Sequence, residues 1–231
     1  MEKGREGTRG SQDKASGSKE LRPDMEDNKV HVFHGEWDEE GVYFYQAYCE
    51  EIASWALEHQ TLGGPSFKPV RMTWIKPSLA WVLYRSGYGR KPGQTSVLKI
   101  KLHHAVVAEL LGGCTHKKGG GGGWGRVQWD PARDLMTSER KGRQGALPRR
   151  CLRQRAIQIG LKGRLSEIYV ENIISVEDVT HLARQIEEAH GRKTESEVRQ
   201  AMEELRSLLP VEREYLPACG EAKLRELGMI V

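Results

Sequence analysis

The order in which short apolar patterns follow one another along the chain constrains its fold most. β-Branched and aromatic residues come early, at Val30, Val32 and Val42–Tyr45, on either side of an acidic turn at Gly35–Gly41, which predicts two strands that can pair as a hairpin. Amphipathic helical patterns gather at the end of the chain. Strands first and helices last favour an α+β fold over a doubly wound one: a single mixed, largely antiparallel sheet covered by helices, with C-terminal amphipathic helices.

The remaining patterns place helices and strands along the chain. Helices are predicted over residues 50–59, 79–84 with Pro77 at the start, 104–111, 166–174, 178–190 and 196–209. Further strands are predicted over residues 71–75, 96–102, 127–129 and 156–161. Residues 137–148 read as a polar, basic connector.

Composition along the chain predicts one folded domain of residues 29–217. Residues 1–28 are rich in Gly, Ser, Lys and Glu and are expected to be a disordered tail, because they contain too few large apolar side chains to offset their ordering entropy. Residues 112–125 are expected to be a flexible glycine-rich loop and residues 218–231 a C-terminal extension. The five glycines at 119–123 are not followed by the Lys-Ser/Thr pair of a phosphate-binding P-loop.

Neither a membrane span nor an export signal is expected. The most apolar window, Ser78–Tyr84, has only seven residues, whereas a span needs about 20, and Met1–Gly10 is charged. The four cysteines form no Cys-x-x-Cys pair, and His103 and His104 are adjacent rather than four residues apart, so no metal site is expected. A cytoplasmic or nuclear protein without a membrane partner follows, and the sequence implies no particular cofactor or oligomeric state.

Charge is strongly segregated along the chain. The formal net charge is only +4, but residues 59–164 contain 21 basic and four acidic side chains. The flanking segments are acidic: residues 29–58 contain one basic and seven acidic side chains, and residues 165–231 contain eight basic and 14 acidic side chains. Such segregation favours a polyanionic partner or a phosphorylated ligand. The alternative is that the acidic flanks fold over the basic middle and neutralise it.

The densest group of chemically useful side chains lies in and after the segment Arg71–Ser78. A guanidinium matches a phosphate with two hydrogen bonds, an ammonium acts as a point charge, and a helix beginning near Ser78 offers backbone N–H groups to the same anion. Trp74 and Trp81 could stack on a base, although both could instead be core residues, with Arg71 and Lys76 simply exposed. The predicted ligand-binding residues are Arg71, Thr73, Trp74, Lys76, Ser78, Arg85, Lys91 and Gln94.

Several ordered blocks of sequence resemble the domain-of-unknown-function family 4291. The blocks are Tyr45–Tyr48, Ile52-Ala53, Arg71–Ser78, Tyr84–Gly87, Lys91–Gln94, Val127–Pro131, Ala156–Leu161 and Asp178–Thr180. The resemblance runs from about Val42 to Pro217 and departs from the family pattern at residues 112–125, where a longer ordinary segment is expected. It implies membership of a family found in bacteria and eukaryotes, without an assigned activity.

The leading functional hypothesis is an enzyme that processes a nucleotide or nucleic acid. Basic residues would hold phosphate, a tryptophan would stack the base, and Tyr45, Gln46 or Asp130 would position the reacting group. The element order faintly resembles the ADP-ribosyltransferase arrangement, which is an analogy of fold only. Its weak point is that the Glu-x-Glu sequence Glu195-Ser196-Glu197 starts a predicted helix rather than lying on a strand.

Two other function classes stay open. One is a non-catalytic nucleic-acid-binding module, in which the basic segment contacts backbone phosphates and tryptophans stack on unpaired bases. The other is an interaction scaffold that uses the acidic helices of residues 178–209, which also read as amphipathic cover for a sheet. No nucleophilic triad is indicated, because Ser78 and Ser86 lack the Gly-x-Ser-x-Gly context.

Overall fold

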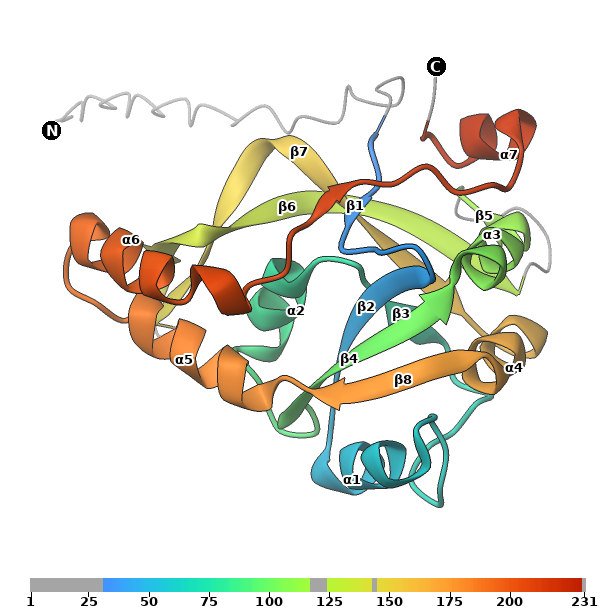
Figure 1. The fold of residues 1–231 in the computed structure, drawn as a ribbon, viewed down its shortest axis with the longest axis horizontal. Helices are drawn as coiled ribbons and strands as arrows, with labels where there is room; N and C mark the ends of the chain where they lie inside the picture. Colours follow the sequence, from blue (N-terminus) through green and yellow to red (C-terminus); the bar gives the residue numbers. More distant parts are fainter. Residues whose placement is uncertain (1–30, 117–123, 143–144, 230–231) are drawn as a thin grey trace, which may run out of the picture.

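Two antiparallel sheets and a short strand pair make up the β-structure of the computed structural model, which describes residues 31–116, 124–142 and 145–229 (Figure 1). The three-stranded sheet has the order β2-β4-β8 and the four-stranded sheet the order β3-β7-β6-β5, with β5 and β6 parallel. The third pair is β1-β9. The strands are β1 (His34–Gly35), β2 (Gly41–Tyr48), β3 (Thr73–Ile75), β4 (Ser96–His103), β5 (Cys114–Thr115), β6 (Gly125–Arg140), β7 (Ala146–Leu161), β8 (Ile173–Asp178) and β9 (Arg213–Glu214).

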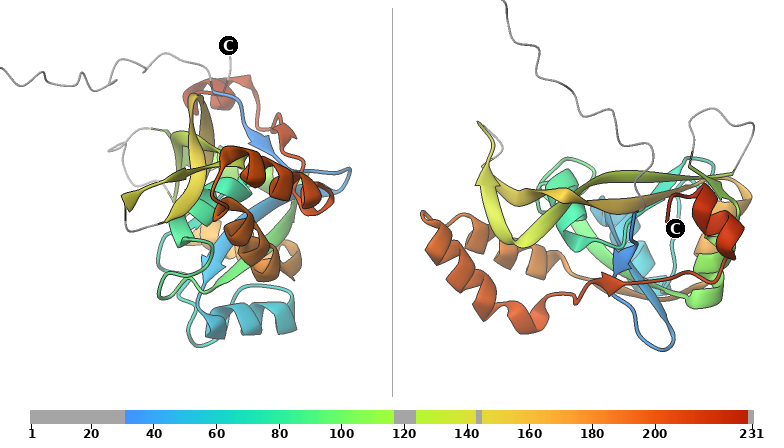
Figure 2. Two further views of the ribbon diagram at one scale, coloured as in Figure 1. Left: turned by 90° about the vertical axis from the view of Figure 1, so that its left-hand side faces the viewer. Right: turned by 90° about the horizontal axis from the view of Figure 1, so that it is seen from above.

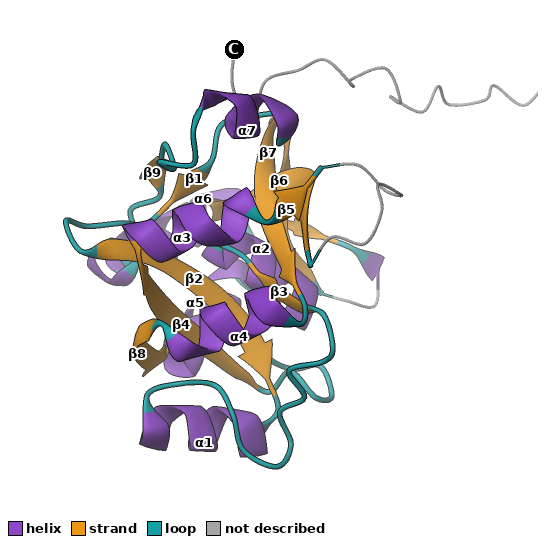
Figure 3. Ribbon diagram, turned by 90° about the vertical axis from the view of Figure 1, so that its right-hand side faces the viewer, coloured by secondary structure: helices purple, strands orange, loops and turns teal. Residues whose placement is uncertain are grey.

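The α+β class predicted from the sequence is confirmed, but the strands form three sheets rather than one. The helices are α1 (Glu50–His59), α2 (Leu79–Ser86), α3 (His104–Gly112), α4 (Arg164–Glu171), α5 (Thr180–His190), α6 (Glu195–Glu204), the 3-10 helix Arg206–Leu208 and α7 (Glu221–Glu226). Helices α5 and α6 lie at one end of the molecule and α3 and α4 at the other; Figure 3 views the molecule from the α3 and α4 end. The expected tail, residues 1–28, and most of the glycine-rich loop lie outside the described residues.

The hairpin expected from the sequence forms only as a short pairing across the acidic turn, where Trp37 and Val42 make an antiparallel bridge and the Tyr43 N–H donates to the Glu36 carbonyl oxygen at 2.9 Å. Strand β1 pairs with β9, with His34 opposite Glu214. Acidic side chains of the intervening turn bind lysines of β4: Lys99 Nζ lies 2.9 Å from Glu36 Oε1, and Lys101 Nζ lies 2.9 Å from Asp38 Oδ2. These ion pairs hold the turn against the sheet, and β1 itself pairs with a distant part of the chain rather than with β2.

The predicted connector of residues 137–148 is also wrong, because β6 and β7 continue through most of it as a two-stranded ribbon (Figure 2). The ribbon contains irregularities between Pro131 and Arg133 and between Asp134 and Ser138. Its polar sequence gave no strand signal because both faces of its outer half are partly exposed. The predicted helix of residues 166–174 ends early, since Ile173 opens β8, where a β-branched residue packs well.

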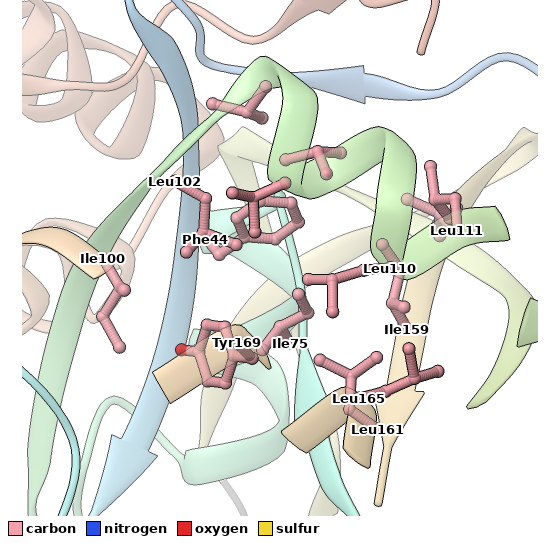
Figure 4. Close-up of a cluster of buried hydrophobic side chains, with 14 of the residues drawn as sticks. Phe44, Ile75, Ile100, Leu102, Leu110, Leu111, Ile159, Leu161, Leu165 and Tyr169 are labelled. Atoms are coloured by element: carbon pink, nitrogen blue, oxygen red, sulfur yellow. The ribbon is translucent and has the colours of Figure 1, made fainter. Parts of the chain in front are cut away.

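Two apolar clusters hold the elements together. The larger packs β2 and β4 against β6, β7, α3 and α4, and includes Phe44, Ile100, Leu110, Ile159 and Tyr169 (Figure 4). The segment expected as a C-terminal extension contributes Leu224, Leu227 and Met229 to the same cluster. The smaller cluster joins α2, α5 and α6 to the end of β2 and to the ribbon. Within the described ranges, no helix combines the length and apolar content that a membrane crossing requires.

Candidate functional site: a basic cleft between the two sheets

A cleft of about 870 Å³ opens where the two larger sheets meet. The junction is a backbone bridge between β2 and the end of β3, in which the Tyr45 N–H donates to the Lys76 carbonyl oxygen at 2.7 Å. Side chains from β2, β3, β6, β7 and α2 line the cleft, together with the loops 66–72 and 93–94. The site therefore combines segments separated by more than 100 residues in the sequence.

One wall is a face of the four-stranded sheet. Trp74 on β3 lies opposite Gly160 on β7, and Gln158 lies opposite Gln128 on β6. Residues two apart on a strand share a face, so Asp130 joins this row, and Gln158 Nε2 donates to its Oδ2. Gly160 allows the tryptophan to lie across β7, because a Cβ at this position would come within 2.9 Å of the Trp74 ring.

The opposite wall comes from α2 and β2. Trp81 is buried at 6% exposure, and its indole Nε1 has no hydrogen-bond partner among the described residues. Arg85 lies one turn further along α2 and is exposed. Phe67 and Tyr48 pack edge to face at 6.3 Å between ring centroids. Aromatic rings thus face the cleft from three directions.

A buried glutamine ties the cleft to the core. Gln46 Nε2 donates to the Tyr48 hydroxyl at 2.9 Å and to the Trp74 carbonyl at 3.2 Å. The Tyr169 hydroxyl donates to Gln46 Oε1 at 2.5 Å. The amide therefore uses both of its N–H groups and its oxygen within the protein. Burial raises the pKa of both Tyr48 and Tyr169, so both phenols stay protonated at neutral pH.

The cleft also contains an ammonium and a carboxyl group whose pKa values are shifted, those of Lys76 and Asp130. Burial, and then the nearby Arg85, lower the pKa of Lys76 to about 8, against a weaker opposite effect of Asp130. Burial raises the pKa of Asp130, opposed by Arg85, Lys76 and Arg155. The Lys76 Nζ also donates to the Trp74 carbonyl at 2.9 Å. A cleft with an ammonium near its titration range beside a carboxyl group is typical of ligand-binding and catalytic sites.

The ion pairs distinguish the cleft from much of the basic segment. Outside it, Lys99 and Lys101 bind the acidic turn after β1, Arg90 binds Glu187 on α5, and Arg149 binds Glu195 on α6. For these cations, the acidic flanks of the chain do neutralise the basic middle, which was one of the two interpretations of the charge pattern. In contrast, no ion pair within the described residues involves the cleft cations, which are Lys68, Arg71, Lys76 and Arg85.

The structure brings most of the predicted site residues together. Eight of them line the cleft: Gln46, Arg71, Thr73, Trp74, Lys76, Arg85, Gln94 and Asp130. Three do not, namely Tyr45, Ser78 and Lys91. Tyr45 is adjacent to Gln46 on β2 and so points to the other face, where its hydroxyl donates to Glu36 Oε2 at 2.6 Å.

Ser78 and Lys91 are also used elsewhere. Ser78 precedes the first residue of α2, and its hydroxyl bonds to the buried carboxyl group of Glu212, which accepts from the Leu79 N–H at 3.0 Å. Burial raises the pKa of Glu212 to about 7. The Lys91 Nζ donates to the Arg85 carbonyl. The start of α2 is thus capped by a carboxyl group from a distant segment, and no cleft ligand needs to occupy it.

Sequence reasoning missed several cleft residues, among them Tyr48, Gln128 and Gln158. The two glutamines could have been found from the sequence. Each is a polar residue within an otherwise apolar strand, and each lies two positions from another residue that faces the same side of its strand. Gln128 is two residues before Asp130, and Gln158 is two residues before Gly160. Polar residues that share one face of otherwise apolar strands indicate a functional surface.

No cluster of three or more His, Cys, Asp or Glu side chains suited to a metal ion occurs in the part of the chain that the structure describes. A search of curated proteins finds no match to the chain. A family model described as "Domain of unknown function (DUF4291)" matches residues 33–215, a range that includes every side chain lining the cleft. The chain belongs to the DUF4291 family of domains of unknown function.

Proposed function

We propose that the cleft binds a nucleotide, with its phosphates held by Arg71, Lys76 and Arg85 and its base stacked on an aromatic side chain. One observation carries this proposal: the cleft gathers cations for which the described protein supplies no ion-pair partner. Like charges held close together repel one another, and an anionic ligand relieves that repulsion. Arginine and lysine are the side chains that bind phosphate best.

A nucleotide fits better than a simple anion because of the size and lining of the cleft. Its volume of about 870 Å³ lies within the range of small-molecule sites, about 300–1,000 Å³. The half-buried Trp74 and its neighbours offer π-faces, and stacking of a base on such a ring is worth about 1–3 kcal/mol. The glutamines of the sheet wall can donate to and accept from a base edge.

Enzymatic processing of the nucleotide would rest on Asp130. Of the three residues proposed for this role from the sequence, Tyr45 lies outside the cleft and Gln46 uses its polar groups internally. Burial raises the pKa of Asp130 above its usual value, which is the direction that favours a carboxyl group acting in proton transfer. The ADP-ribosyltransferase analogy gains no support from Glu197, whose side chain forms a capping box with Thr194 at the start of α6.

A thermal-shift measurement tests the proposal. ATP, AMP and adenosine are added to the wild-type chain and to Arg71→Ala, at low and moderate salt. Because a ligand that binds only the folded state raises the melting temperature, ATP is expected to stabilise the wild type more than AMP, and adenosine least. Arg71 is exposed, so its variant should melt like the wild type without ligand and gain less from ATP. Equal shifts in both proteins would contradict a phosphate role for Arg71.

The affinity for ATP is expected to fall as the pH rises from 7 to 9. The Lys76 ammonium has a pKa of about 8, so it is mostly charged at pH 7 and mostly neutral at pH 9. Since an anion favours the charged form, the loss should reach about tenfold over this interval. Isothermal titration calorimetry at several pH values measures it, with Lys76→Gln as the control that should show a flat profile. A flat wild-type profile would refute the contribution of Lys76.

A further inference from the structure

The outer part of the β6–β7 ribbon presents a second basic surface. Residues 125–161 contain nine basic and three acidic side chains. Three arginines on β7 are exposed: Arg149 and Arg150, which as neighbours on the strand point to opposite faces of the ribbon, and Arg153. We call these three residues the arginine strip. They lie towards the end of the ribbon away from Gln158, the residue of the same strand that lines the cleft.

Most of the positive charge of the arginine strip is not used in ion pairs within the described structure. In the described structure no ion pair involves Arg150 or Arg153. Arg149 binds Glu195, but both side chains are exposed, 46% and 77%, and such a pair is weak. The acidic ribbon residues nearby are used within the ribbon, since Glu139 binds Arg133 and Lys141.

A second hollow lies between the C-terminal end of α2 and the outer ribbon. It has a volume of about 380 Å³ and is lined by Tyr84, Lys91 and the ribbon residues Ala146 and Leu147, among others. Tyr84 is adjacent to the cleft residue Arg85 on α2, and the Lys91 Nζ donates to the Arg85 carbonyl. This hollow contains an aromatic ring and a lysine together with the carboxylate of Glu187, and we expect a chain molecule that leaves the cleft past α2 to contact it.

We propose that the ligand of the cleft is one nucleotide of a single-stranded nucleic acid, whose neighbouring backbone phosphates bind the arginine strip. This inference rests on the proposed nucleotide function of the cleft and extends it. A free mononucleotide would fill the cleft and leave the second hollow and the strip without a role. A base within a duplex is hidden by its partner, whereas an unpaired base can enter a cleft and stack on aromatic rings.

The test compares binding of a fluorescein-labelled ten-nucleotide single strand, as RNA and as DNA, with binding of ATP. Four proteins are measured: the wild type, the strip variant Arg149→Gln/Arg150→Gln/Arg153→Gln, the cleft variant Lys76→Gln/Arg85→Gln, and a control that loses the same charge elsewhere. The control is Arg164→Gln/Arg206→Gln/Arg225→Gln, three exposed positions on α4, the 3-10 helix and α7. Fluorescence anisotropy gives the strand affinity at several salt concentrations, and circular dichroism checks the fold.

The strip variant is expected to bind the strand at least tenfold more weakly and to bind ATP like the wild type. The logarithm of the binding constant falls with the logarithm of the salt concentration, with a slope of about −0.7 for each phosphate contact to a single strand. The loss of three contacts should therefore make this slope less steep by about 2. The cleft variant should have a lower affinity for both the strand and ATP, and the control should keep the wild-type affinity for both.

Other outcomes separate the two proposals. Unchanged strand binding by the strip variant, or a ten-base-pair duplex that binds as tightly as the single strand, overturns this inference while the nucleotide cleft stands. If the cleft variant loses ATP but keeps the strand, the strand binds elsewhere and the inference also fails. If the cleft variant keeps both ligands, the proposed function fails as well.

Discussion

Replacing Lys76 and Arg85 by glutamine together is expected to weaken ATP binding by at least 100-fold. A hydrogen bond to a charged group contributes about 1.5–3 kcal/mol, and each 1.4 kcal/mol corresponds to a factor of ten in affinity. Two such contacts therefore account for two orders of magnitude or more. The fold should persist, because Arg85 is exposed and because a glutamine at position 76 can still donate to the Trp74 carbonyl, as the Lys76 Nζ does.

Isothermal titration calorimetry of the double variant measures this loss. The matched control is Arg164→Gln/Arg206→Gln, which removes two exposed cations from α4 and the 3-10 helix and should leave affinity unchanged. Removing the positive charge of Lys76 also removes the cost of burying it, so the melting temperature of the free double variant should not fall. A folded double variant with wild-type affinity would show that the cleft does not hold phosphate.

The largest effect on stability is expected from Gln46→Leu. The substitution leaves the hydroxyl of Tyr169, which is fully buried, without its acceptor and removes the bonds to Tyr48 and to the Trp74 carbonyl. An unsatisfied buried polar group costs about 1–3 kcal/mol, so a total loss of about 3 kcal/mol is expected. For a domain of this size that lowers the melting temperature by on the order of 10 °C.

Differential scanning calorimetry checks this prediction, with two further variants as controls. Tyr48→Phe removes a hydroxyl at the cleft and should cost about 1 kcal/mol or less. Tyr169→Phe in the Gln46→Leu background removes the stranded hydroxyl and should recover part of the lost stability, because the two sites are coupled. If Gln46→Leu melts like the wild type, the amide does not hold the cleft to the core.

Local sequence patterns predicted most of the helices and the strands β2, β3 and β4 well, but not β1, β5, β8, β9 or α7. Helix α1 begins and ends at the predicted residues, Glu50 and His59, because its apolar spacing is a property of residues close together in the sequence. The prediction for the outer half of the β6–β7 ribbon was wrong for the opposite reason. Its strands are defined by hydrogen bonds to each other. The few apolar residues of this part, such as the buried Leu147, do not alternate regularly with polar ones, so there is no strand pattern to detect.

The same contrast holds for the candidate site. The sequence by itself determined the family, the α+β class and the concentration of cations and aromatics in residues 71–94. Only the tertiary structure decided that Gln46 faces the cleft while Tyr45 faces Glu36, and that Gln128 and Gln158 belong to the site. It also decided which cations are neutralised, since ion pairs such as Lys99–Glu36 join residues far apart in the chain. Composition and periodicity report what each segment can do, but strand register and long-range pairing determine which side chains meet.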